Sequence, residues 1–219
     1  MTRAVTRLLN KIPHPTLARL TLLEELKRQL PSLKAGVTLD VGGGHTPYKR
    51  WVPHTKYLTL DLDPNKHPDI CCDLHHVQWE SSYFDTILAT EVLEHLYDPR
   101  QAIKEMFRLL KDDGVCVLST RFIHPIHGAP MDYYRFTADG LRHLFSDFEE
   151  VLVVPLGNRI QALWLLSTHN RLKGKVKRLM LLLEPFTRLL ARLKVEGTSM
   201  PLGYLVVARK RKSATASAS

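Results

Sequence analysis

The chain has 219 residues, a formal net charge of +9 and a hydrophobic content of 44%. This length and apolar content suffice for one sizeable core and favour a single α/β domain over two. Three cysteines are too few for a disulfide framework, and no apolar run approaches the roughly 18 residues of a membrane span, so we expect neither a secreted cystine-rich protein nor an integral membrane protein. We predict a cytoplasmic protein.

The first 34 residues are predicted to form an N-terminal helical arm. Its clearest helix runs from Thr21 to Leu30, and Pro31 follows as a stop because proline lacks the backbone donor that would continue the helix. The main domain is then expected over residues 35–212.

An apolar strand runs directly into an acid and three glycines in the segment TLDVGGGHTP, residues 38–47. Glycines are needed where a strand turns sharply into a helix and where the backbone must approach a ligand closely. A dinucleotide fingerprint requires a further glycine where this chain has Pro47, so NAD and FAD are disfavoured. We therefore predict a Rossmann-like sheet with a different nucleotide-type cofactor, held by Asp40, Gly42, Gly43 and Gly44.

A second apolar strand ends at Asp61, about twenty residues after the glycines. At this offset in such a sheet, a carboxylate accepts the protons of both ribose hydroxyls. We place Asp61 and the adjacent Leu62 in the cofactor site and expect Asp63 to cap the turn that begins at Pro64. The alternative is that the Asp-x-Asp pair holds a metal ion for a sugar-nucleotide transferase.

The following segments continue the alternation of strands and helices. The sequence predicts a short strand with a terminal acid over Ile70–Leu74, then a strand over Tyr83–Thr90 and the phrase EVLEHL over Glu91–Leu96. A helix capped by Asp98 and Pro99 is predicted from Arg100 to Leu110, and the turn KDDG ends this helix. A buried strand is predicted over Val115–Thr120.

These segments, in this order, resemble class I S-adenosylmethionine (SAM)-dependent methyltransferases. The phrase EVLEHL and the turn LLKDDG are similar to the subgroup that includes ubiquinone-biosynthesis and glycan-modifying enzymes. The resemblance covers residues 36–156 and returns at the final strand, Gly203–Lys210. It implies a doubly wound seven-stranded sheet, mostly parallel with an antiparallel last strand, and SAM as the cofactor. It also implies that Asp73 lies beside the adenine amino group and that Leu74 packs on the ring; Thr90 completes the predicted cofactor site.

The phrase MDYYRFT, residues 131–137, also resembles this subgroup. We assign Tyr133, Tyr134 and Arg135 to acceptor binding, since the planar fork of an arginine suits a phosphate or carboxylate. Methyl transfer to a hydroxyl group benefits from a base, and the imidazole pKa suits that role near neutral pH. The candidates are His95, His124 and His127, and the sequence does not decide between them.

A metal site within EVLEHL is an alternative that the sequence leaves open. On a helix, Glu91, Glu94 and His95 would share one face, and related ubiquinone O-methyltransferases hold a divalent cation with matching residues. The same phrase occurs in relatives without metal, so we predict no metal site. The neighbouring pairs Cys71–Cys72 and His75–His76 lack the spacing of zinc ligands.

A helical insertion is predicted over residues 158–200, between the last two strands, Phe148–Pro155 and Gly203–Lys210. Basic residues alternate there with apolar residues at helical spacing, and the cations include Lys173, Lys175, Lys177 and Arg178. Such helices either pack on the domain or lie on an anionic membrane surface. Nucleic acid is disfavoured as a partner because no RNA-binding or zinc-finger motif accompanies the charge. The small, polar tail 213–219 is expected to be disordered.

The sequence therefore predicts a SAM-dependent methyltransferase that acts, most simply at oxygen, on a small-molecule, glycan or lipid-linked acceptor, with a peripheral contact at the inner face of the membrane as a further expectation. The alternative is a catalytically silent protein of the same fold that binds a partner or membrane through the insertion. A scaffold has no need of Asp40, Gly42, Gly44 and Asp61, which argues against this alternative.

Overall fold

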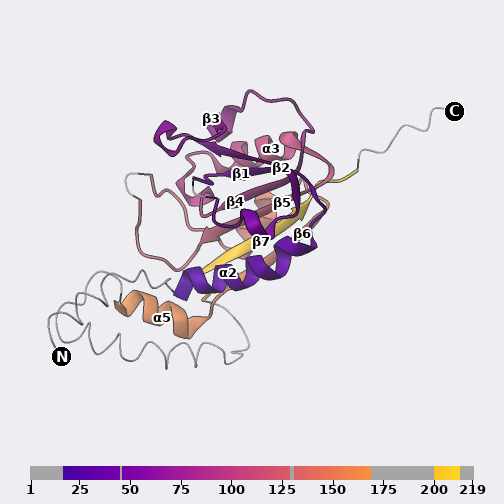
Figure 1. Cartoon of the computed structure of the whole chain (residues 1–219). Helices are drawn as coiled ribbons and strands as arrows, with labels where there is room; N and C mark the ends of the chain where they lie inside the picture. The colour runs from indigo at the N-terminus through magenta and orange to yellow at the C-terminus, as the bar shows by residue number, and fades with distance from the viewer. Residues whose placement is uncertain (1–16, 45, 129–130, 169–199, 213–219) are drawn as a thin grey trace.

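The computed structural model describes residues 17–44, 46–128, 131–168 and 200–212 (Figure 1). Helices and strands alternate along the chain as predicted. The main elements are α2 (Leu17–Gln29), β1 (Gly36–Val41), β2 (His54–Asp61), β3 (Ile70–Cys71), β4 (Phe84–Thr90), α3 (Pro99–Leu109), β5 (Leu110–Arg121), α4 (Ala138–Leu144), β6 (Glu150–Leu156), α5 (Arg159–Thr168) and β7 (Gly203–Arg209).

One seven-stranded sheet forms the centre of the domain, with the strand order β3-β2-β1-β4-β5-β7-β6. The first five strands in this order pair in parallel, and β7 runs antiparallel between β5 and β6. This arrangement confirms the predicted fold, a doubly wound Rossmann-like sheet with an antiparallel last strand. Most residues of the central strands β4 and β5 are buried, because helices cover both faces of the sheet.

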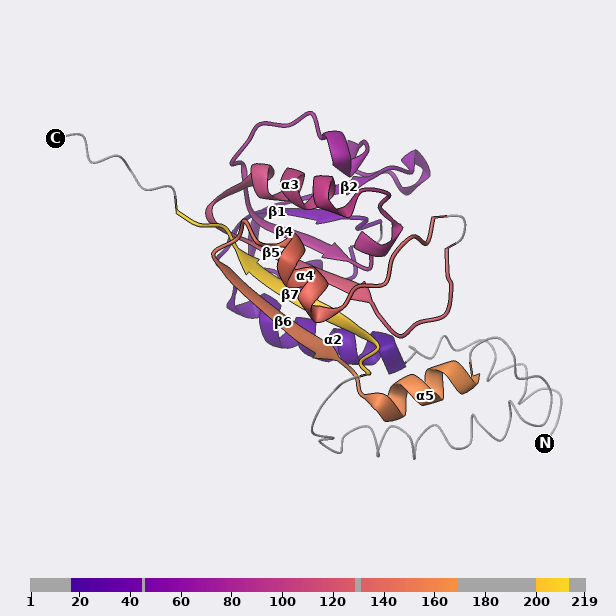
Figure 2. The same ribbon diagram turned by 180° about the vertical axis from the view of Figure 1, so that it is seen from behind.

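Helices α3 and α4 cover one face of the sheet and α2 covers the other, as the two opposite views show (Figures 1 and 2). Successive residues of a strand point to opposite faces, so Leu88 of β4 packs in the cluster that holds Leu22 and Leu26 of α2, whereas the preceding Ile87 packs in the cluster of α3. The N-terminal arm thus contributes a buried apolar face to the core. Its described helix, Leu17–Gln29, includes four residues before the predicted start, and a short 3₁₀ turn containing Pro31 follows it.

The segment KDDG differs from the prediction. Asp98 caps α3 as expected, by accepting a hydrogen bond from the backbone N–H of Gln101 at 3.0 Å. However, α3 ends at Leu109, and the following residues open β5 instead of forming a separate turn. The β4–β5 ladder shifts its register between Phe84 and Thr86. Leu110 and Val115 pair with Phe84 and Thr86, and the residues KDDG, which the sequence assigned to a turn, lie in the irregular part of the strand between these two pairs.

Of the predicted insertion, the structure describes α5 at its start. Ala162 and Leu165 of this helix pack with Ala18 of α2 and Leu202. The basic residues Lys173, Lys175, Lys177 and Arg178 and the tail 213–219 lie outside the described residues. No helix in the described ranges combines the length and the apolar character that crossing a membrane requires.

Lys210 follows the last strand and has a structural role that its place in a basic run conceals. Its ammonium group donates hydrogen bonds to the carbonyls of Phe107 (2.9 Å) and Leu110 (2.7 Å), where α3 ends without further helical partners. Burial lowers the pKa of Lys210. The charged donor therefore satisfies orphan carbonyls at the helix terminus.

We predict that Lys210→Met lowers the free energy of unfolding by about 1 to 3 kcal/mol, because two buried carbonyls lose their donor. Lys212→Met is the matched control, since the Lys212 side chain is 75% exposed and pairs with Asp113 at the surface. Urea unfolding of both variants is the measurement. Equal midpoints for the two variants would contradict a capping role for Lys210.

Candidate cofactor and acceptor site

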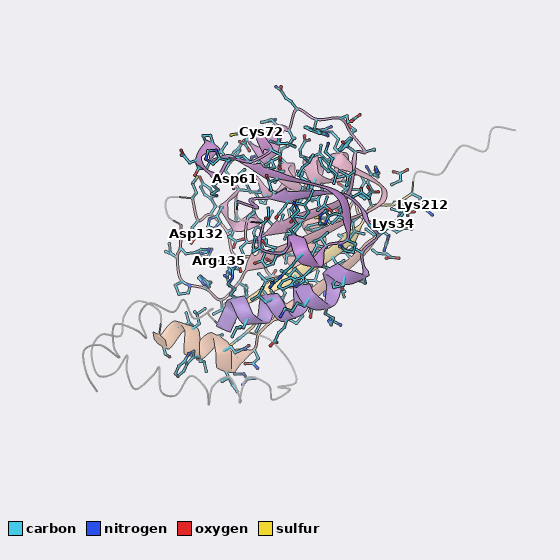
Figure 3. All side chains as sticks on the ribbon, in the orientation of Figure 1. Lys34, Asp61, Cys72, Asp132, Arg135 and Lys212 are labelled. Atoms are coloured by element: carbon cyan, nitrogen blue, oxygen red, sulfur yellow. The ribbon has the colours of Figure 1, made fainter. Side chains whose placement is uncertain are left out.

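The centre of the sheet contains the point at which the strand order changes direction. Strands β1 and β4 are neighbours there, and the connections that follow them leave toward opposite sides. In open α/β sheets, ligands bind beside the carboxyl ends of strands at such a point. Figure 3 shows Asp61, Asp132 and Arg135 gathered at one end of the domain, whereas Lys34 and Lys212 lie at the other end.

Two adjoining cavities open at these strand ends, with volumes of about 380 and 310 Å³. They share Gly42, Lys66, Thr90 and Glu91. The larger cavity has a mostly apolar lining, which includes Val41, Leu60, Leu62, Leu74, Val92, Leu96 and Met131. The smaller cavity is bounded by charged and polar groups, which include Arg19, Asp40, Tyr48 and Lys66.

All nine residues that the sequence assigned to the cofactor line one of these cavities. Asp61, Leu62, Asp73 and Leu74 line the larger one, Asp40, Gly43 and Gly44 line the smaller one, and Gly42 and Thr90 line both. The fold therefore brings the predicted set together, while each residue's contact with a cofactor stays a prediction. Sequence reasoning missed Arg19 and Lys66, because neither belongs to a motif and only the packing of their segments brings them to the cavities.

The glycine loop has its own structural reasons for lacking side chains. Gly42 adopts φ +69°, which L-residues rarely occupy, and its N–H donates to the carbonyl of Leu60 at 2.7 Å. A Cβ at Gly42 would lie 2.7 Å from Cγ2 of Val92, and a Cβ at Gly43 would overlap the Asp40 carboxyl group. The loop consequently follows the sheet edge closely and leaves the cavities open.

Asp40 is a buried carboxyl group at the end of β1. The hydroxyl of Tyr57 donates a hydrogen bond to its Oδ2 at 2.7 Å. Burial raises the pKa of Asp40 to about 6, although the hydrogen bond from Tyr57 acts in the opposite direction. The loop thus holds a proton-binding group close to neutral pH.

Asp61 ends β2 with a carboxylate that faces the larger cavity and is only 7% exposed. Its Oδ1 accepts a hydrogen bond from the backbone N–H of Asp63 at 3.0 Å, and its Oδ2 pairs with Lys66 at 2.9 Å. Asp63 instead caps the following 3₁₀ turn by accepting from the N–H of Asn65, as predicted. The two aspartates therefore have separate roles in the local structure.

The segment EVLEHL is not an α-helix, so the helical arrangement in which Glu91, Glu94 and His95 would share one face does not occur. Glu91 adopts φ +57° and a single 3₁₀ turn covers Leu93–His95. Glu91 pairs with Arg121 at 2.6 Å, whereas Glu94 is fully buried and accepts a hydrogen bond from the hydroxyl of Thr120 at 2.8 Å. Ion pairing and burial, which local spacing does not encode, separate the two carboxylates.

The loop after β5 carries the residues assigned to the acceptor. The backbone N–H groups of Tyr133 and Tyr134 both donate to the carbonyl of Glu94, at 2.9 and 3.3 Å. Arg135 donates to both carboxylate oxygens of Asp132, at 2.6 and 2.8 Å, and to nearby carbonyls. These contacts fix the loop beside EVLEHL, and an anionic acceptor at Arg135 would compete with Asp132. Acceptor binding by Tyr133, Tyr134 and Arg135 stays a prediction.

The three candidate histidines lie in a row. His95 lines the larger cavity, and its ring centroid is 4.9 Å from that of His127, which is 4.7 Å from that of His124. Burial lowers the pKa of His127. The fold thus joins candidates from EVLEHL and from the loop after β5 at the mouth of the cavity, and the choice of a general base stays open.

Comparison with known proteins bears on this geometry. Residues 39–118 match the family model of a methyltransferase domain. No curated protein sequence matches the chain significantly. The matched residues contain the glycine loop, Asp61, Asp73 and EVLEHL.

Solved structures share the fold at low identity. The [4+2]-cyclase SpnF has a TM-score of 0.58 at 18% identity over 89% of this chain and 82% of that chain. A SAM-dependent methyltransferase from Archaeoglobus fulgidus has a TM-score of 0.56 at 12% identity over 89% and 95%. Phosphoethanolamine N-methyltransferase 2 from Haemonchus contortus, in complex with SAM, has a TM-score of 0.56 at 15% identity over 87% and 52%.

At these identities the structural likeness shows the fold. Together with the family match and the cavity lining, it supports SAM as the cofactor and, in general terms, a class I SAM-dependent methyltransferase. Membership of the narrower EVLEHL subgroup stays a prediction.

We predict that Asp61→Ala weakens SAM binding by about 1.5 to 3 kcal/mol, because the ribose hydroxyls lose a charged acceptor. Asp63→Ala is the control, since Asp63 caps a turn and does not line either cavity. Isothermal titration with SAM is the measurement. Similar affinities for the two variants would remove Asp61 from the cofactor site.

A second prediction concerns Asp40 in the absence of cofactor. The folded protein retains the Asp40 proton up to about pH 6, whereas the unfolded chain releases it near pH 3.8. The stability that Asp40 contributes is therefore full below about pH 4 and is lost as the pH rises through about 6. Asp40→Asn should exceed wild type in free energy of unfolding by up to about 3 kcal/mol at pH 7.5, and by less at pH 5. Urea unfolding at both pH values tests this, and a pH-independent difference would contradict it.

Proposed function

We propose that the protein transfers the methyl group of SAM to an oxygen atom of a small-molecule, glycan or lipid-linked acceptor. The observation that carries this proposal is the pair of adjoining cavities at the carboxyl ends of β1, β2 and β4, one mostly apolar and one charged. An adenosine and an amino-acid group are the two halves of SAM, and the two linings match them in chemical character.

The residues present fit this cofactor. Asp61 supplies acceptors for ribose hydroxyls, and Leu62 and Leu74 supply an apolar wall for the base. The smaller cavity offers both signs of charge, with Arg19 and Lys66 for a carboxylate and Asp40 for an ammonium group. Bound SAM supplies an electrophilic methyl group on a sulfonium.

The protein's part in such a displacement is to align the acceptor oxygen and to exclude water. The larger cavity reaches His95, Gly128 and Met131, which belong to EVLEHL and the loop after β5. An acceptor held by this loop would thus meet the apolar end of the cofactor cavity. The exposed rings of Tyr133 and Tyr134 offer a surface for an apolar or sugar group beside it.

The rival proposal is a silent SAM-binding protein. The fold also occurs in the [4+2]-cyclase SpnF, so the fold by itself does not specify methyl transfer. The charged and apolar linings support cofactor binding under either proposal, and only turnover separates them.

The deciding experiment incubates the protein with cell extract and SAM that carries an isotopically labelled methyl group, followed by mass spectrometry of aqueous and organic fractions. We expect a labelled product with wild type and little with Asp61→Ala at a SAM concentration below the variant's dissociation constant. Normal SAM binding without any labelled product would favour the silent protein.

The two fractions also distinguish acceptor classes. A lipid-linked acceptor places the label in the organic fraction, and a sugar or small polar acceptor places it in the aqueous one. Leu163 and Leu166, which α5 exposes, support a peripheral membrane contact through the insertion. Flotation with anionic and neutral vesicles tests this contact, and equal recovery from both would argue against the role of the cations.

A further inference from the structure

The segment EVLEHL contains a buried carboxylate, Glu94, of which one oxygen lacks a hydrogen-bond partner among the described residues. Glu94 is 0% exposed, and its Oε2 accepts the hydrogen bond from Thr120. Its Oε1 is also buried, and none of the described residues forms a hydrogen bond with it. Leaving such an oxygen unsatisfied is costly, so the structure calls for a cationic or protic partner at this point.

Two imidazoles face this oxygen. The Nδ1 atom of His95 is hydrogen-bonded to the carbonyl of Met131, and because a carbonyl only accepts, Nδ1 carries the proton and Nε2 keeps its lone pair. The Nε2 atom of His127 lies 3.9 Å from Oε1 of Glu94. One ligand atom each from Glu94, His95 and His127 therefore lie within 4.8 Å of one another.

We propose that Glu94, His95 and His127 bind one divalent transition-metal ion at the acceptor end of the larger cavity. Within the described ranges, no other group of three or more histidine, cysteine or acidic side chains has this geometry. Metal–ligand bonds of about 2.1 Å allow two ligand atoms to lie up to about 4.2 Å apart, so movement of less than about 1 Å closes the set. The two imidazoles favour zinc or iron over magnesium and calcium, and the carboxylate also suits manganese.

The surroundings support a cation at this point. Two of the ligands have a hydrogen-bond partner that orients them, the Met131 carbonyl for His95 and the Thr120 hydroxyl for Glu94. The carboxylate Oδ2 of Asp132 lies 3.7 Å from Nδ1 of His127, which is within range of a charge interaction but not of a hydrogen bond. The nearby cations Arg121 and Arg135 are already paired, with Glu91 and Asp132. Neither arginine therefore pairs with Glu94.

This ligand set differs from the one that the spacing of EVLEHL suggests. Glu91 adopts a left-handed backbone conformation and its carboxylate is engaged by Arg121. The third ligand comes instead from His127, on the loop after β5. The geometry lets an acceptor oxygen approach the ion from the cavity, which would ease loss of the acceptor's proton. That role rests on the proposed methyl transfer, whereas binding of the ion does not.

The test uses the full-length chain without an affinity tag, freed of metal by chelator and dialysis, and titrated with Mn²⁺ by calorimetry. Manganese is chosen because thiolates such as those of Cys71 and Cys72 bind it poorly. We expect one ion per chain, and at least about tenfold weaker binding in both Glu94→Gln and His127→Ala, since each loses a direct ligand. Glu91→Gln is the matched control and should keep the wild-type affinity.

Three outcomes would overturn the proposal: no saturable Mn²⁺ binding by wild type, wild-type affinity in His127→Ala, or a loss in Glu91→Gln as large as that in Glu94→Gln. Circular dichroism checks that each variant is folded. Titration of the same proteins with SAM separates the two proposals, because the ion site predicts lost Mn²⁺ binding with retained SAM binding. Failure of wild type to bind SAM while it still binds Mn²⁺ would instead count against the proposed function alone.

Discussion

The parallel pairing of β1 with β4 is the interaction on which the rest of the site depends. It places the end of β1, with Asp40 and the glycine loop, beside the end of β4, with Thr90 and Glu91. Parallel strands require crossover connections, and the connections on the two sides of this pair diverge. The divergence leaves the space that the two cavities occupy, and the buried apolar clusters on both faces of the sheet hold it open.

Polar groups at this edge are arranged in pairs that limit the cost of burial. Asp61 pairs with Lys66, Glu91 with Arg121, and Asp132 with Arg135. The side-chain hydrogen bond from Arg135 holds the pKa of Asp132 well below its usual range. For Asp40 and Glu94, the described part of the chain supplies no arginine or lysine partner of this kind, and burial raises the pKa of both. Asp40 lies at the glycine loop, and Glu94 lies at the end of the site to which we assign the acceptor.

The side of the site to which we assign the acceptor is built from two segments that are distant in the sequence. The backbone N–H groups of Tyr133 and Tyr134, in the loop after β5, donate hydrogen bonds to the carbonyl of Glu94. Arg135 stabilises the same loop by pairing with Asp132. A substitution in EVLEHL is therefore expected to affect the loop after β5 as well as the larger cavity. The N-terminal helix α2 has a similar double role, because its Leu22 and Leu26 stabilise the sheet while its Arg19 reaches the smaller cavity.

Residue patterns along the chain were enough to predict the strand pattern, the fold class and the residues that line the two cavities, since apolar runs, glycines and terminal acids act over a few residues of chain. It misplaced KDDG and the geometry of EVLEHL, because a register shift in the β4–β5 ladder and the pairing of Glu91 with Arg121 decide these segments. Only the tertiary structure brought Arg19 and Lys66 to the cavities and His127 to Glu94. Such contacts depend on how distant elements pack, and neither residue type nor spacing along the chain carries that information.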